Sequence, residues 1–202
     1  MKSLSEIETV SKRSSRAAGF SWGIAEEVGK NIRILEQFGL GGIKNLNYYF
    51  RIRNKKKFEN LSLITPDNKS NKLEFCPIIA GLNFLDQVRS LESVGKIKFE
   101  KVAFPLLFLP FISRASEIIG KKLQLHIDNK VFLLNYNNSI YSNSFNEGII
   151  EAGNITVEFK ENKDSFEENE WKELYQLSEN TFVEESESLK EVGAGAGLTD
   201  ND

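Results

Sequence analysis

The stretch that decides the fold class is Leu123-Gln124-Leu125-His126-Ile127-Asp128-Asn129-Lys130-Val131-Phe132-Leu133-Leu134. Its first half alternates between apolar and polar residues, which is the period of a strand with one buried face. Asp128 and Asn129 favour a tight turn, and a second apolar run follows at once. The pattern therefore predicts two antiparallel strands joined by a hairpin.

Further elements are predicted on both sides of this hairpin. Alternating residues over 96–100 and 155–159 predict two more strands. Helices are predicted from Ser3, where Glu6 completes a capping box, from Ser21, from about residue 43, after Pro77 and over 112–119. A late helix carries Trp171, Leu174, Tyr175 and Phe182, whereas residues 54–73 read as a loop.

The strands cluster late in the chain, and their local signal is antiparallel pairing, so an α+β fold is favoured over a doubly wound α/β fold. We expect N-terminal helices packed on a small, mainly antiparallel sheet, followed by a late helix and a Gly-rich C-terminal tail. The expected organisation is one globular domain over residues 1–192 and a tail over 193–202 that can dock on it.

The composition supports a sizeable core and excludes several classes of site. Of 202 residues, 40% are hydrophobic and 27% are charged, as in ordinary globular domains. One Cys and one His cannot form a disulfide within the chain or a Cys/His zinc site, so no metal centre is predicted. A net charge of -3 argues against nucleic-acid binding. No apolar run approaches the length of a membrane span, and no signal peptide is recognisable, so a cytoplasmic protein is expected.

Charge is divided unevenly along the chain. Residues 1–157 hold 22 Lys and Arg against 15 Asp and Glu, whereas residues 158–191 hold 4 Lys against 12 Asp and Glu. An acidic segment after a basic body is typical of a chain that meets a partner or folds back on itself. The densest basic run, residues 51–57, is interpreted as a solvated helix end and not as a nucleic-acid patch.

The sequence supports neither a cysteine–histidine catalytic pair nor a glycine-rich nucleotide-binding loop. Cys76 lies in an apolar setting before Pro77, which is typical of an inert buried thiol, so a Cys76–His126 pair is not favoured. The glycines at 39–42 and 193–197 match neither the phosphate-binding P-loop nor the dinucleotide fingerprint. No catalytic residue and no cofactor is therefore assigned.

A candidate ligand site combines the start of the second helix with the tail. Carboxylates, hydroxyls and an indole are the groups it would offer, and carboxylates serve as general bases or as ligands for hard cations. The residues are Ser21, Trp22, Glu26, Glu27, Thr199, Asp200 and Asp202. The simpler interpretation is that the two glutamates complement the helix dipole and that the tail is a frayed end.

Two motifs carry a resemblance to a known family. They are Ala17-Ala18-Gly19-Phe20-Ser21-Trp22-Gly23-Ile24-Ala25-Glu26-Glu27-Val28-Gly29 and Gly193-Ala194-Gly195-Ala196-Gly197-Leu198-Thr199-Asp200-Asn201-Asp202. With a looser match around residues 76–81, the chain resembles an uncharacterised bacterial family of unknown function. An Arg that similar sequences place shortly before the tail is absent here, where Leu189 follows Ser188. The resemblance implies no activity and supplies no catalytic residues.

Two functions follow from these observations. The first is an accessory or regulatory protein that acts with a protein partner or as a homo-oligomer, which agrees with the divided charge and the lack of His/Cys chemistry. The alternative is a small-molecule-binding protein or enzyme whose carboxylate-lined site is closed by the C-terminal tail.

Overall fold

The structure is a computed structural model that describes residues 2–70, 72–135, 139–143, 148–161 and 163–181. The chain divides into two compact units, Met1–Asn162 and Lys163–Asp202. The helices of the first unit are α1 (Leu4–Ala17), α2 (Trp22–Gln37), α3 (Gly42–Arg53), α4 (Pro77–Leu91) and α5 (Leu109–Ile119), with short 3₁₀ turns η1 (Glu92–Val94) and η2 (Pro105–Leu107). Its strands are β1 (Asp67–Asn68), β2 (Lys96–Ala103), β3 (Lys122–Ile127), β4 (Lys130–Asn135), β5 (Ser139–Ser142) and β6 (Ala152–Lys160).

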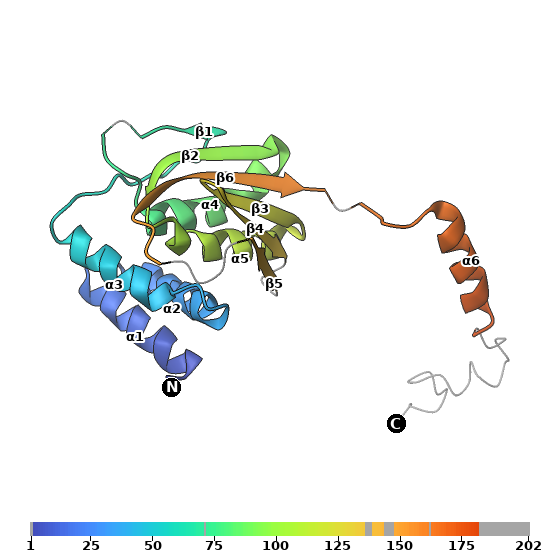
Figure 1. Cartoon of the computed structure of the whole chain (residues 1–202), viewed down its shortest axis with the longest axis horizontal. Coiled ribbons are helices and arrows are strands. Elements are labelled where there is room, and N and C mark those ends of the chain that lie inside the picture. The colour runs from blue at the N-terminus through green and yellow to red at the C-terminus, as the bar shows by residue number, and fades with distance from the viewer. Residues whose placement is uncertain (1, 71, 136–138, 144–147, 162, 182–202) are drawn as a thin grey trace, which may run out of the picture. The chain divides into compact units, whose positions relative to one another are not determined.

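The six strands form one sheet in the order β1-β2-β6-β3-β4-β5 (Figure 1). Among the named strands of the described residues, only the two-residue β1 runs parallel to its neighbour, and the other four strand pairings are antiparallel. The predicted α+β class is therefore confirmed.

The predicted hairpin is formed by β3 and β4. Leu125 lies opposite Phe132, and Ile127 lies opposite Lys130. Asp128 has a φ of 51°, a left-handed conformation that Asp tolerates better than most residues and that tight hairpins require. On the other side of β3, β6 pairs antiparallel and brings Val157 opposite Leu125. The late strand thus lies at the centre of the sheet.

The core lies between one face of the sheet and helices α4 and α5 (Figure 1). Its centre includes Phe84, Phe99 and Phe108, with ring centroids 5.1 Å apart for the closest pair, Phe99 and Phe108. Helix α5 contacts β3 and β4 directly, whereas α2 packs on α5 and α1 packs on α2. The N-terminal helices therefore form an outer layer that packs on α5, α4 and η2.

Three details differ from the sequence-based expectations. The predicted loop over 54–73 contains β1, and β5 was not anticipated, because strands of two and four residues carry almost no periodic signal. Helix α5 starts at Leu109 and not at residue 112, since Pro110 lies in its first turn, where a missing N–H costs nothing.

The second unit contains helix α6 (Glu168–Glu179). This helix confirms the predicted late helix at Trp171, Leu174 and Tyr175, whereas Phe182 lies outside the described residues. None of the described helices is long and apolar enough to cross a membrane.

Candidate functional site

The start of α2 has the local structure that the sequence predicts. The Ser21 side chain accepts a hydrogen bond from the Ile24 N–H at 3.4 Å and caps the helix. Trp22 is 58% exposed, and the guanidinium of Arg16 lies 5.6 Å from the centroid of its ring. The Ser21 hydroxyl therefore stabilises the start of α2, whereas the Trp22 indole is exposed to solvent.

Both predicted carboxylates of α2 are engaged in ion pairs. Glu26 binds Lys12 at 3.0 Å and Lys30 at 3.4 Å, and these lysines, Lys12 foremost, lower the pKa of its carboxyl group. Glu27 binds Lys30 at 3.0 Å and also Arg114. Partial burial opposes ionisation of Glu27, but the hydrogen bonds from Lys30 and Arg114 prevail and lower its pKa. The two carboxylates thus tie α2 to α1 and to α5.

The tail half of the predicted site lies outside the described residues. Thr199, Asp200 and Asp202 are in this part of the chain, so their approach to Ser21 or Trp22 stays a prediction. Within the described part of the chain, no three His, Cys, Asp or Glu side chains are grouped to hold a metal ion.

Cys76 and His126 are placed in different surroundings. Cys76 is 3% exposed, and its sulfur lies 3.1 Å from the Tyr49 hydroxyl. Burial raises the pKa of the thiol, and burial with the neighbouring Cys76 raises the pKa of the Tyr49 phenol, so both groups are neutral at pH 7. His126 lies in β3, opposite Val131 and Thr156. No described contact joins the cysteine to the histidine.

A cavity of about 520 Å³ lies beside the α2 start, and we call it the basic cavity. Three stretches of chain that are distant in sequence line it: the loop and first turn of α2, the end of α3 with the turn after it, and the start of α4. The lining residues are Gly19, Phe20, Ser21, Ile24, Tyr49, Arg53, Lys56, Lys57, Phe58, Asn60, Cys76 and Ile79. Within the described part of the chain, this lining contains three basic side chains and no Asp or Glu.

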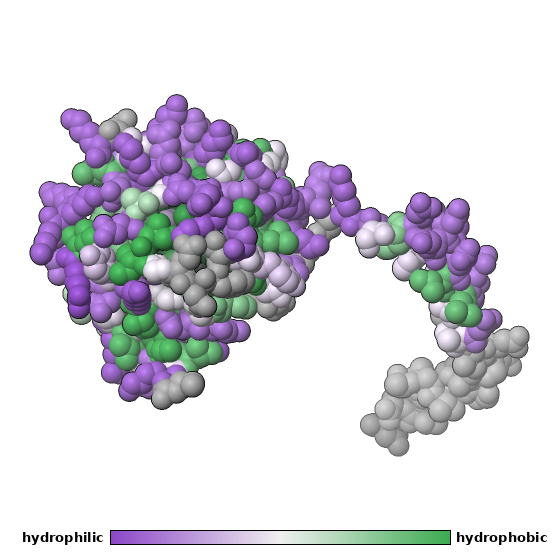
Figure 2. Space-filling model, in the orientation of Figure 1, coloured by the Kyte–Doolittle hydropathy of each residue, from purple (hydrophilic) through white to green (hydrophobic). Residues whose placement is uncertain are grey.

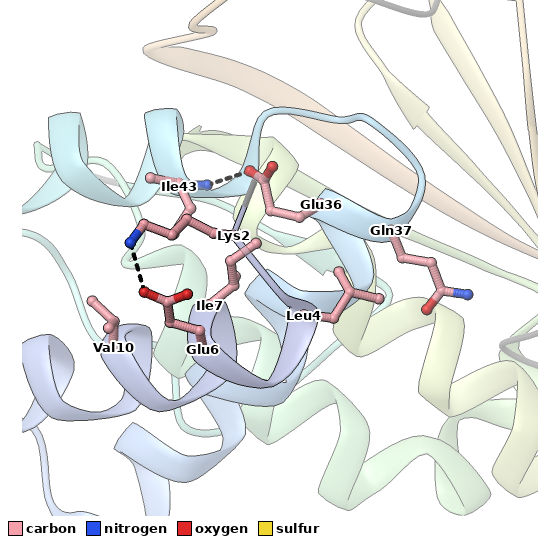
Figure 3. A pocket seen from close by; sticks show the side chains of 8 residues that line it. All are labelled: Lys2, Leu4, Glu6, Ile7, Val10, Glu36, Gln37 and Ile43. Carbon is pink, nitrogen blue, oxygen red and sulfur yellow. Dashed lines mark hydrogen bonds and ion pairs between the residues drawn. The ribbon is translucent and has the colours of Figure 1, made fainter.

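A second hollow, the apolar groove, lies where α1, α2 and α3 meet (Figure 3). Its volume is about 690 Å³, and its apolar lining residues are Leu4, Ile7, Val10 and Ile43. Charged side chains border it: Lys2 pairs with Glu6 at 2.8 Å, and Glu36 accepts the Ile43 N–H at 2.8 Å. The Glu36 carboxylate thereby caps α3, whose N-cap residue Gly41 has no side chain to do so.

Helix α6 carries an exposed apolar face and no buried residue. Trp171, Leu174 and Tyr175 follow the i, i+3, i+4 spacing of one helix face and are 51%, 64% and 51% exposed. Trp171 stacks on Phe166 with ring centroids 5.6 Å apart, which is the contact of a hydrophobic staple before a helix. Apolar residues stand out on this segment among hydrophilic ones (Figure 2).

Residues 2–75 match the family model described as Protein of unknown function (DUF3726). The match supports the resemblance to an uncharacterised family, and it includes the motif around Ser21 and the whole apolar groove. No curated protein and no solved structure matches the chain. The description names no function, so no residue role can be carried over from the family.

The sequence did not lead us to predict the basic cavity or the capping box at the start of α6. The basic run was interpreted as a helix end, and α3 does end within it, at Arg53. The cavity beside this run could not be read from local patterns. The acidic capping box of Glu167 and Glu170 in α6, flanked by Phe166 and Trp171, was a local signal that could have been found.

Proposed function

We propose that the protein is an accessory or regulatory protein that binds another protein through the apolar face of α6. The observation that carries this proposal is an amphipathic helix with exposed Trp171, Leu174 and Tyr175 and no buried residue. Isolated helices shorter than about 12–15 residues are marginal in water and gain most of their stability when an apolar face is covered. A helix of this kind is a common ligand for a groove on a partner protein.

The acidic residues around α6 indicate what kind of surface the partner offers. Residues 163–181 contain six Asp and Glu against two Lys, so the apolar face of α6 lies within an acidic surface. The complementary surface is an apolar groove bordered by Lys and Arg. The apolar groove of a second copy does not fit this description, since two of its three charged side chains, Glu6 and Glu36, are acidic. We therefore expect a different protein.

The test is photo-crosslinking in the cells that make the protein, with a photoreactive residue at position 174 or, as the matched control, at position 176. Leu174 belongs to the apolar face, whereas Gln176 lies on the opposite side of the same helix. The proposal expects one protein to be captured from position 174 and not from 176. That protein is then identified, purified and mixed with the full chain.

With the purified partner, Trp171→Ala is expected to weaken binding by roughly 30-fold, the value of a central aromatic hot spot of about 2 kcal/mol. Gln176→Ala should change the dissociation constant by less than about threefold, and affinity should fall as salt screens the acidic helix. Equal crosslinking from both positions, a crosslinked dimer of the chain itself, or full affinity in Trp171→Ala would each overturn the proposal.

A further inference from the structure

We propose that the basic cavity binds a small phosphate ester, with the phosphate beside Lys57 and Arg53 and the apolar part against Phe58. The described residues that line the basic cavity belong to the first unit and not to α6, so this inference stands apart from the proposed protein partner.

The charge of the cavity is the first argument. Among the residues that the structure describes, Arg53, Lys56 and Lys57 line it, and no carboxylate does. Lys56 is paired with Glu74 at 2.7 Å, but Lys57 has no ion-pair partner among the described residues. The dipole of α3 accounts for Arg53 in its last turn, yet Lys56 and Lys57 lie beyond the end of that helix. The helix dipole therefore does not explain why Lys56 and Lys57 line the same cavity as Arg53.

The position of Arg53 is fixed by contacts that leave its charge at the cavity. Its guanidinium donates a hydrogen bond to the Ala18 carbonyl oxygen, and it lies 4.3 Å from the centroid of the Phe20 ring. Neither contact is with a carboxylate, so neither of them neutralises the positive charge. A preorganised guanidinium of this kind suits the oxygen atoms of a phosphate.

The backbone adds to this positive field. Ser21 and Cys76 are the N-cap residues of α2 and α4, and both line the cavity. Two helix N-termini therefore lie at its wall, and the partial positive charge there favours an anion. The Tyr49 and Cys76 side chains are neutral and hydrogen-bonded to each other, so they do not offset the three cations.

The size and the remaining walls indicate that the anion belongs to an organic molecule. A volume of about 520 Å³ is within the range of small-molecule sites and exceeds what a bare inorganic anion fills. Phe20, Ile24, Phe58 and Ile79 give the cavity apolar wall beside its charges. A phosphate ester with a small apolar or aromatic group fits both features.

The test uses calorimetric titration of the full chain with phenyl phosphate, inorganic phosphate and benzoate at about 0.15 M salt, where surface charges are screened. We expect saturable binding of phenyl phosphate that is tighter than that of the other two probes. Lys57→Gln should weaken it by roughly tenfold, as expected when one charged hydrogen bond is lost. Lys55→Gln is the matched control, because it removes the same charge two residues away on a side chain that does not line the cavity.

Both lysines are exposed, so neither substitution should disturb the fold, and circular dichroism checks this. Amide chemical shifts provide a second readout, since phenyl phosphate should perturb Gly19 and Ile79. The proposal is overturned by the absence of saturable binding for all three probes. It is also overturned by tighter binding of benzoate, by equal losses in the two lysine variants, or by shifts confined to residues outside the cavity.

Discussion

Gly29 allows α1 and α2 to pack closely, so Gly29→Ala tests the packing of the N-terminal layer. A Cβ atom at this position would lie 2.8 Å from the Glu8 carbonyl oxygen and 3.1 Å from the Lys12 Cβ. The nearer atom belongs to the backbone of α1, so it cannot rotate away as the end of a side chain could. The substitution therefore forces the two helices apart.

Two opposing effects set the change in the free energy of unfolding that Gly29→Ala causes. Replacing Gly by Ala inside a helix stabilises it by up to about 1 kcal/mol, whereas overpacking a close contact costs about 1–3 kcal/mol. Because the contact is with backbone, we take the upper end of that cost. Gly29→Ala should then lower the free energy of unfolding by about 2 kcal/mol, which corresponds to a Tm lower by about 4–8 °C.

Gly23→Ala is the matched control, since Gly23 is in the same helix and a Cβ there would meet nothing within 4 Å. It should leave stability unchanged or raise it by up to about 1 kcal/mol. Urea unfolding of the wild type and both variants, followed by circular dichroism, gives the three free energies. If Gly29→Ala proves as stable as Gly23→Ala, the close approach of α1 and α2 is wrong.

Three further predictions concern the first unit. Gly81→Ala should destabilise the protein by about 3 kcal/mol or more in the same urea assay, because the new Cβ would lie 2.3 Å from Phe111 Cδ2; wild-type stability would contradict the α4–α5 packing. The pKa of Glu158 is lowered from 4.5 to about 2, chiefly by its hydrogen bond with Lys160, so this pair stabilises the fold above pH 4.5 and loses that effect as the pH falls toward 2. Glu158→Gln should therefore cost about 1 kcal/mol at pH 7 and nothing near pH 2, and a pH-independent difference would refute the assignment. Finally, the Cys76 thiol, 3% exposed and with a raised pKa, should react with a thiol reagent at least roughly 100-fold more slowly in the native protein than in denaturant; equal rates would show that it is accessible.

The candidate sites differ in how far the sequence could predict them. The cap at Ser21 and the apolar face of α6 depend on residues within one or two helical turns, so the sequence was sufficient. The ion pair of Glu27 with Arg114 was not predictable, since Arg114 lies 87 positions later in the chain. The basic cavity likewise joins Ser21, Lys57 and Cys76, which no local pattern relates.

By itself, the sequence determined the elements whose signals are short-range. The caps at Ser3 and Ser21 and the alternation from Leu123 to Ile127 with the turn at Asp128 are such signals, because capping hydrogen bonds and strand period act between residues only a few positions apart. Only the tertiary structure decided that β6 lies between β2 and β3 and that the basic run lines a cavity. These arrangements arise when distant segments bury their apolar faces together, and many pairings of those faces agree with the same local pattern.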